Sequence, residues 1–208
     1  MTIEVASPFY KILSKIARTL IVSCQADDGE PLAAPEHIKA LAMSAIMGGA
    51  KALRLEGVEN IKALRGVTDL PIIGLSKSKN ILNQDRLNSV YITASFAEAK
   101  ELALAGSDII ALDATARPRA DNLSLAQTIE RIHNELGKAV WADVGTYEEA
   151  VEAQNLGADV ISTTLFGYTK ETERTAACGP DFALLKKMTT LTVPVVLVGR
   201  VWLPEEVT

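Results

Sequence analysis

The stretch AVWADVGTYEEAVEAQNLGADVISTT, residues 139–164, predicts a β-strand, an α-helix and a second β-strand in succession. Two apolar runs rich in β-branched residues flank a segment with helical periodicity. Thr146 with Glu149 three residues later forms a capping-box signature, and Gly157 marks the end of the helix. Such a unit joins two parallel strands by a right-handed crossover. The stretch therefore predicts an α/β protein built on a parallel sheet.

The same alternation of strand and helix continues along the rest of the chain. Most of the apolar runs are hydrophobic at both alternating positions, which is typical of strands buried on both faces. The expected strands cover 19–24, 51–56, 70–75, 108–114, 139–144, 159–164 and 193–198. The expected helices cover 35–47, 60–67, 95–104, 124–136, 146–156 and 181–190, while 90–93 is expected to be an extended part of a loop.

Two folds share this alternation, a doubly wound sheet and a TIM (β/α)₈-type barrel. The first strand is followed by SCQADDGEP, residues 23–31, which is not a glycine-rich dinucleotide turn. Polar residues also recur where strands end, and barrel active sites are built there. We therefore expect a single barrel domain over residues 1–208, with an N-terminal helix in 1–18 covering the barrel. Seven strands are expected, so the eighth strand and the last helix are expected to be missing.

Composition narrows the possible partners. The net charge is −5 and no basic tract is present, so nucleic acid is not an expected partner. No apolar run approaches the roughly 20 residues needed to span a membrane. Two cysteines, Cys24 and Cys178, suggest a reduced, cytoplasmic protein. His37 and His133 have no metal-ligand spacing, so neither a metal nor another cofactor is expected.

Two basic residues, one directly after an expected strand and one within a strand, are candidates for catalysis or substrate binding. Lys77 directly follows the third expected strand, and a desolvated lysine there is able to transfer a proton or form a Schiff base. The alternative is an ordinary solvated loop lysine, as is expected of Lys79. Arg54 lies within an apolar strand, so it requires a carboxylate or phosphate partner. Glu56 is a possible structural partner for it.

Further candidates follow later strands. Asp143 ends the fifth expected strand, where it is placed to hold a substrate hydroxyl or to orient Lys77. Asp113 is open to the same role or to capping the turn DATARPR, residues 113–119. Gly199 and Arg200 follow the seventh strand, a region that often supplies backbone N–H groups to a phosphate in barrels. The simpler interpretation of Gly199 is a turn glycine.

Taken in order, the segments LIVSCQ, ALRLEGV, LPIIGLSK, DIIALDATARPR, ISTTLFGYT and VPVVLVGR resemble the N-acetylmannosamine-6-phosphate 2-epimerases. The resemblance runs from about Thr19 to the last residue. It implies metal-free interconversion of N-acetylmannosamine 6-phosphate and N-acetylglucosamine 6-phosphate, a step in sialic-acid catabolism. A phosphorylated N-acetyl amino sugar is then the expected partner.

The resemblance also assigns roles to individual residues. Lys77 matches the family's proton-transfer lysine, which makes it the expected catalytic residue. Gln25, Arg54 and Asp143 match the family's substrate contacts, and Gly199 with Arg200 matches one half of its phosphate clamp.

Two departures from the family pattern bear on activity. Val198 stands where the family usually has a glutamate that is the second catalytic group, and valine cannot transfer a proton. The family's last helices, eighth strand and glycine-rich phosphate turn are also not found. An alternative is therefore a catalytically impaired or non-catalytic sugar-phosphate-binding paralogue. Open strand edges in such a barrel favour pairing with another chain, so a homo-oligomer is expected.

Overall fold

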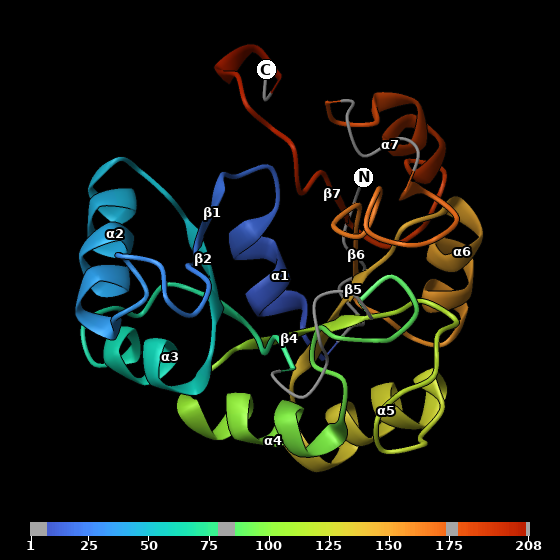
Figure 1. The fold of residues 1–208 in the computed structure, drawn as a ribbon, viewed down its shortest axis with the longest axis horizontal. Helices are drawn as coiled ribbons and strands as arrows, with labels where there is room; N and C mark the ends of the chain where they lie inside the picture. Colours follow the sequence, from blue (N-terminus) through green and yellow to red (C-terminus); the bar gives the residue numbers. More distant parts are fainter. Residues whose placement is uncertain (1–7, 79–85, 174–178, 207–208) are drawn as a thin grey trace.

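A computed structural model describes residues 8–78, 86–173 and 179–206, which form a curled parallel sheet with helices outside it (Figure 1). The seven strands of this part of the chain lie side by side in sequence order, and every neighbouring pair is parallel. A doubly wound sheet reverses its strand order at a switch point, so this order excludes that alternative. The strands are β1 (Ile21–Cys24), β2 (Ala52–Glu56), β3 (Ile72–Leu75), β4 (Ile109–Asp113), β5 (Ala139–Asp143), β6 (Val160–Ser162) and β7 (Val195–Val196).

The helices follow the predicted alternation and form an outer arc around the strands (Figure 1). Three of them begin with a complete capping box, at Ser95, Ser124 and Thr146. The segment expected as one helix over 124–136 instead changes to a π-helical turn in its second half. The helices are α1 (Tyr10–Ile16), α2 (Pro35–Met47), α3 (Val58–Arg65), α4 (Phe96–Ala105), α5 (Leu125–Arg131), η2 (Ile132–Leu136), α6 (Tyr147–Asn155), α7 (Phe182–Met188) and η4 (Pro204–Glu206).

Alternating side chains of the strands divide the core into two layers. In β3, for example, Ile72 packs in the outer layer against helices, whereas Ile73 and Leu75 belong to the inner layer. Leu13 and Ile16 of α1 join this inner layer. The period of two thus sends every second side chain towards the inside of the curl.

The curl is open between its first and last strands. Within the described residues, β1 pairs only with β2, and β7 pairs only with β6. The seven strands therefore form a TIM-barrel-type sheet that is not closed by an eighth strand, as predicted. The tetrapeptide 90–93 forms no named strand, also as predicted, but an isolated antiparallel bridge joins Ile92 to Lys77.

Gly74 in β3 allows a close approach between the sheet and the turn before β4. A Cβ atom added at Gly74 would lie 2.0 Å from Oγ of the buried Ser107 and 3.0 Å from Cδ1 of Ile61. We predict that Gly74→Ala lowers the free energy of unfolding by about 1–3 kcal/mol, because overpacking displaces buried neighbours. Urea unfolding measures the change.

Gly66 provides the matched control for this substitution. It ends α3, and a Cβ atom there meets nothing within 4 Å. Gly66→Ala is expected to leave stability within about 0.5 kcal/mol. Equal effects at both positions would contradict the packing role of Gly74.

Candidate functional site

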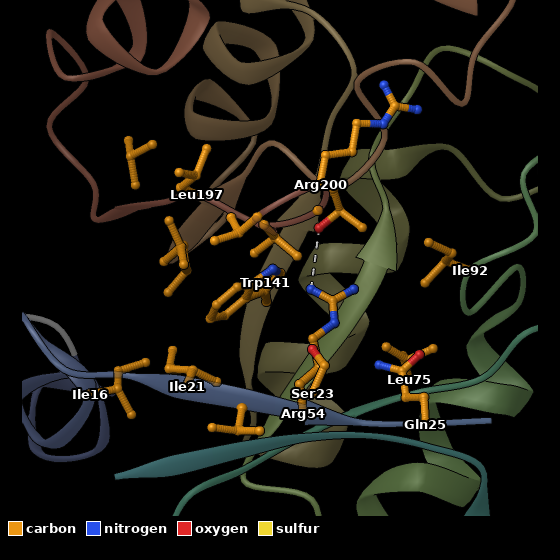
Figure 2. Close-up of a pocket in the computed structure, with 18 of the residues that line it drawn as sticks. Ile16, Ile21, Ser23, Gln25, Arg54, Leu75, Ile92, Trp141, Leu197 and Arg200 are labelled. Carbon is orange, nitrogen blue, oxygen red and sulfur yellow. Dashed lines mark hydrogen bonds between the residues drawn. The ribbon is translucent and has the colours of Figure 1, made fainter. Parts of the chain in front are cut away.

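A cavity of about 1530 Å³ lies along the inside of the curl, and Figure 2 shows part of its lining. Its walls come from both edges of the sheet and from the strands between them. Apolar side chains of the inner core and polar side chains at strand ends both line it. The residues that line this cavity include Gln25, Asp27, Arg54, Lys77, Val198 and Arg200.

Arg54 and Asp143 form a buried ion pair at the centre of the site. The side chain of Arg54 is 3% exposed and that of Asp143 is 0% exposed. Nη1 of Arg54 donates to Oδ1 of Asp143 at 2.9 Å, and Nη2 donates to Oδ2 at 2.5 Å. This two-point geometry fixes the plane of the guanidinium. The pairing shows that the carboxylate predicted for Arg54 is supplied by Asp143, while Glu56 accepts from the backbone N–H of Lys77 at 3.4 Å.

Three further donors hold the carboxylate of Asp143. Its Oδ1 accepts from Nε1 of Trp141 at 3.0 Å, Oγ of Ser162 at 2.7 Å and Oγ1 of Thr164 at 2.8 Å. The guanidinium of Arg54 also lies 5.6 Å from the centre of the Trp141 ring. Asp143 is therefore surrounded by protein donors, and it is Arg54 that reaches the cavity wall. In the structure, Asp143 positions the guanidinium of Arg54. A direct contact of Asp143 with substrate stays a prediction.

Lys77 stands at the mouth of the cavity and is paired with an acid. Lys77 follows Leu75 by two residues, so its side chain is expected on the same, inward-facing side as that of Leu75. Its Nζ lies 2.7 Å from Oδ1 of Asp27, which is in the loop after β1. The hydrogen bond from Lys77 lowers the pKa of Asp27, and the positive charge of Arg86 contributes to the same shift. The two side chains are 27% and 57% exposed, so substrate is able to reach them.

The segment after β7 adds a second basic group. Gly199 has a φ of +89° and Arg200 one of +58°, so the chain turns sharply there. The guanidinium of Arg200 stacks over Tyr168 at 4.8 Å, beside Gly167. A Cβ atom on Gly167 would lie 2.2 Å from Nη1 of Arg200. The absence of a side chain at Gly167 therefore leaves room for the guanidinium. Binding of phosphate by Gly199 and Arg200 stays a prediction.

Val198 presents a hydrocarbon side chain to the cavity. It packs against the inner core as a partly buried residue, two positions after Val196 on the same face. Its backbone N–H donates to Oγ1 of Thr163 at 3.0 Å, and its carbonyl accepts from the same hydroxyl at 3.0 Å. The hydroxyl of Thr163 is thus occupied with the backbone of Val198, and the wall of the cavity here is apolar.

Asp113 has the structural role that its position before a turn predicted. Its Oδ1 accepts from the backbone N–H and the hydroxyl of Thr115, and its Oδ2 pairs with Arg117 at 2.6 Å. Burial raises the pKa of Asp113, while the charge of Arg117 opposes the shift. Asp113 caps the turn and does not line the cavity described above.

The site brings together most of the residues predicted for it and adds two that sequence reasoning missed. Gln25, Arg54, Lys77, Gly199 and Arg200 all line one cavity. Asp27 was missed, although it follows Gln25 by two residues at the end of a strand. Trp141 was also missed as a partner of Asp143, although a spacing of two places both on one face. Lys79 and Cys178 lie outside the described residues.

No helix in the described part of the chain is long and apolar enough to cross a membrane. Within the same ranges, no group of three or more His, Cys, Asp or Glu side chains is arranged to hold a metal ion. The expectations about cofactors stay predictions.

Fold and site together define a (β/α)-barrel protein. Its charged groups lie where parallel strands end, which is where the active sites of barrel enzymes are built. The profile of the family described as "Putative N-acetylmannosamine-6-phosphate epimerase" matches residues 38–208. The chain belongs to this family.

Individual relatives agree with this assignment. A "Putative N-acetylmannosamine-6-phosphate 2-epimerase" of Thermosynechococcus vestitus is 45% identical over 194 residues, covering 93% of this chain and 81% of the relative. A protein of the same name from Cutibacterium acnes is 40% identical over 200 residues, covering 94% and 83%. The solved structure of the N-acetylmannosamine-6-phosphate 2-epimerase from Clostridium perfringens superposes with a TM-score of 0.85 at 38% identity, covering 93% and 82%.

Removing the charge of Asp143 is expected to destabilise the fold strongly. Asp143→Asn leaves the guanidinium of Arg54 buried without its counter-charge, and breaking a buried pair from one side typically costs about 3–5 kcal/mol. Chemical denaturation with circular dichroism measures the loss.

The exposed pair between Lys62 and Glu59, with side chains 57% and 73% exposed, is the matched control. Neutralising it by Glu59→Gln is expected to change stability by less than about 1 kcal/mol. A loss of similar size for both variants would show that burial does not govern the Arg54–Asp143 pair.

Proposed function

We propose that this chain binds N-acetylmannosamine 6-phosphate in the cavity and transfers a proton at C2, interconverting it with N-acetylglucosamine 6-phosphate. Membership of the family supports the reaction. The observation that carries the proposal for this chain is the placement of Lys77 and Arg54 on the wall of one cavity. A step in amino-sugar catabolism, carried out in the cytoplasm, is the corresponding cellular role.

The chemistry requires a base close to C2 and a positive group close to the sugar oxygens. In the ring-opened sugar, C2 lies next to the aldehyde, so loss of its proton leaves an enolate. The amine of Lys77 is assigned to accept that proton. The guanidinium of Arg54, fixed by Asp143, is assigned to bond the sugar oxygens on which negative charge develops. Gln25 is assigned to a further polar contact with the sugar.

The phosphate is assigned to the turn after β7. The positive φ of Gly199 exposes backbone at this turn, and Arg200 adds a guanidinium whose stacking on Tyr168 limits its movement. Both residues line the same cavity as Lys77. A fork of N–H donors suits a phosphate, which accepts several hydrogen bonds at once.

A non-catalytic sugar-phosphate-binding protein is the second candidate. One observation favours it: the cavity wall at Val198 is hydrocarbon, where an acid would have supplied a second proton-transfer group. Absence of a general acid or base typically costs about 10²–10⁴ in rate. Binding of N-acetylmannosamine 6-phosphate with no deuterium entering C2 from D₂O would favour this candidate over the enzyme.

Replacement of Lys77 tests the enzyme. We predict that Lys77→Ala lowers the rate of deuterium incorporation at C2 by at least about 100-fold, because the base is removed. Proton NMR of the sugar in D₂O follows the reaction. Lys62→Ala, which removes an exposed lysine of α3, is the control and keeps the parent rate. Retained exchange in Lys77→Ala would assign the proton transfer to another group.

We also propose that the chain forms a homo-oligomer through the open edges of its sheet. Each of β1 and β7 has one strand neighbour in the described structure, and unpaired edges favour association. Light scattering at micromolar concentrations is expected to give a mass at least twice that of the 22.3 kDa chain. A monomeric mass over the same range of concentration would contradict the proposal.

A further inference from the structure

Backbone hydrogen bonds hold the chain on both sides of Lys77. The N–H of Ser78 donates to the carbonyl of Tyr91 at 2.8 Å, and the N–H of Thr93 donates to the carbonyl of Ser76 at 2.7 Å. Ser76 and Ser78 are the two neighbours of Lys77 in the chain. The peptide units that flank Lys77 are therefore fixed, and with them the direction in which its side chain leaves the backbone.

Thr93 has an unusual backbone conformation for its residue type. Its φ is +46°, and the residue is fully buried. A positive φ crowds the branched Cβ of threonine against the backbone, so such a residue is a rare outlier. The other non-glycine residues with positive φ in the described part of the chain, Arg18, Asn122 and Arg200, have no branch at Cβ. Strain of this kind persists only where the surroundings hold the residue, and it gathers at functional sites.

The polar groups of Thr93 all have partners, and these partners join the end of β3 to β4. Oγ1 of Thr93 accepts from the backbone N–H of Ser76 at 3.2 Å and donates to the carbonyl of Ala111 at 2.6 Å. The carbonyl of Thr93 accepts from Nη2 of Arg119, a buried residue, at 2.5 Å. Glycine would adopt the same φ without strain, but it has no hydroxyl to join Ser76 to Ala111.

We propose that Thr93 is a positioning residue, whose strained backbone and buried hydroxyl hold the end of β3 so that Nζ of Lys77 meets Asp27 at the cavity. That contact is 2.7 Å long, and it joins the segment after β3 to the loop after β1. Because Thr93 is fully buried, it acts through Lys77. Its consequence for the rate of proton transfer rests on the proposed function.

Two substitutions separate the hydroxyl from the shape of the side chain. Thr93→Val keeps the branched shape but leaves the N–H of Ser76 and the carbonyl of Ala111 unpaired. We expect kcat for deuterium entry at C2 of N-acetylmannosamine 6-phosphate in D₂O to fall at least about tenfold, because a small displacement of a catalytic group costs up to about 100-fold. We expect kcat/KM to fall by the same factor. Thr93→Ser keeps the hydroxyl and is expected to restore most of the lost rate.

Thr128→Val is the matched control. Thr128 is also fully buried, and its hydroxyl donates to the carbonyl of Ser124 at 3.0 Å within the first turn of α5. Its loss is expected to lower stability and leave kcat unchanged. Circular dichroism shows whether each variant is folded. Thr93→Gly replaces Thr93→Val if the latter does not fold, since glycine adopts the positive φ freely, and the same fall in kcat is expected.

The pKa of Asp27 gives a second measurement that does not depend on activity. The hydrogen bond from Lys77 lowers this pKa, and the charge of Arg86 contributes to the same shift. Carbon-13 NMR of the carboxyl group is expected to show a higher pKa in Thr93→Val than in the parent, because Lys77 is displaced. Lys77→Ala, which removes the amine, sets the size of the Lys77 contribution. Thr128→Val is expected to keep the parent value.

The outcomes distinguish the role of Thr93 from the proposed function. A parent chain without exchange at C2 would overturn the proposed function, and the pKa of Asp27 would still decide whether Thr93 positions Lys77. An unchanged pKa of Asp27 in folded Thr93 variants would overturn the positioning role. Equal falls of kcat in Thr93→Val and Thr128→Val would also overturn it, because a general loss of stability would then account for both.

Discussion

The buried pair of Arg54 and Asp143 is the interaction on which the rest of the site depends. It joins β2 to β5 across the inside of the curl, between residues 89 positions apart in the sequence. Two buried charges cost solvation energy that only good geometry and additional hydrogen bonds offset. Trp141, Ser162 and Thr164 supply those hydrogen bonds. A guanidinium held in this way is fixed in place before any ligand arrives.

A fixed guanidinium matters because the cavity around it is largely apolar. Positive charge in such surroundings acts more strongly on a nearby negative charge than it would in water, and a guanidinium that is already fixed needs little rearrangement. Lys77 differs from Arg54 in this respect. Its partner Asp27 is 57% exposed, so the ion pair at the mouth is held loosely and is open to competition from a bound sugar. The site thus combines a rigid charge, Arg54, with a more adjustable one, Lys77.

Much of this could be predicted from the sequence because the information is local. Short runs that are apolar at both alternating positions, together with the capping boxes, predicted the element order, and polar residues in or after these runs indicated Gln25, Arg54 and Lys77. The pairings could not be predicted in the same way. Glu56, two residues from Arg54, was a reasonable partner by proximity, whereas Asp143 becomes one only when β2 and β5 face each other across the curl. Asp27 likewise meets Lys77 only because β1 and β3 end at the same mouth.

The cavity surface beside β7 follows from the two-residue period of the strand. A substitution at position 198 changes the cavity, because Val196 and Val198 both face inward, whereas Val195 packs in the outer layer. A change at an outward position would alter packing against helices and leave the cavity surface intact. Position 198 is therefore a place where a substitution changes the chemistry of the cavity surface without disturbing the outer layer of the fold.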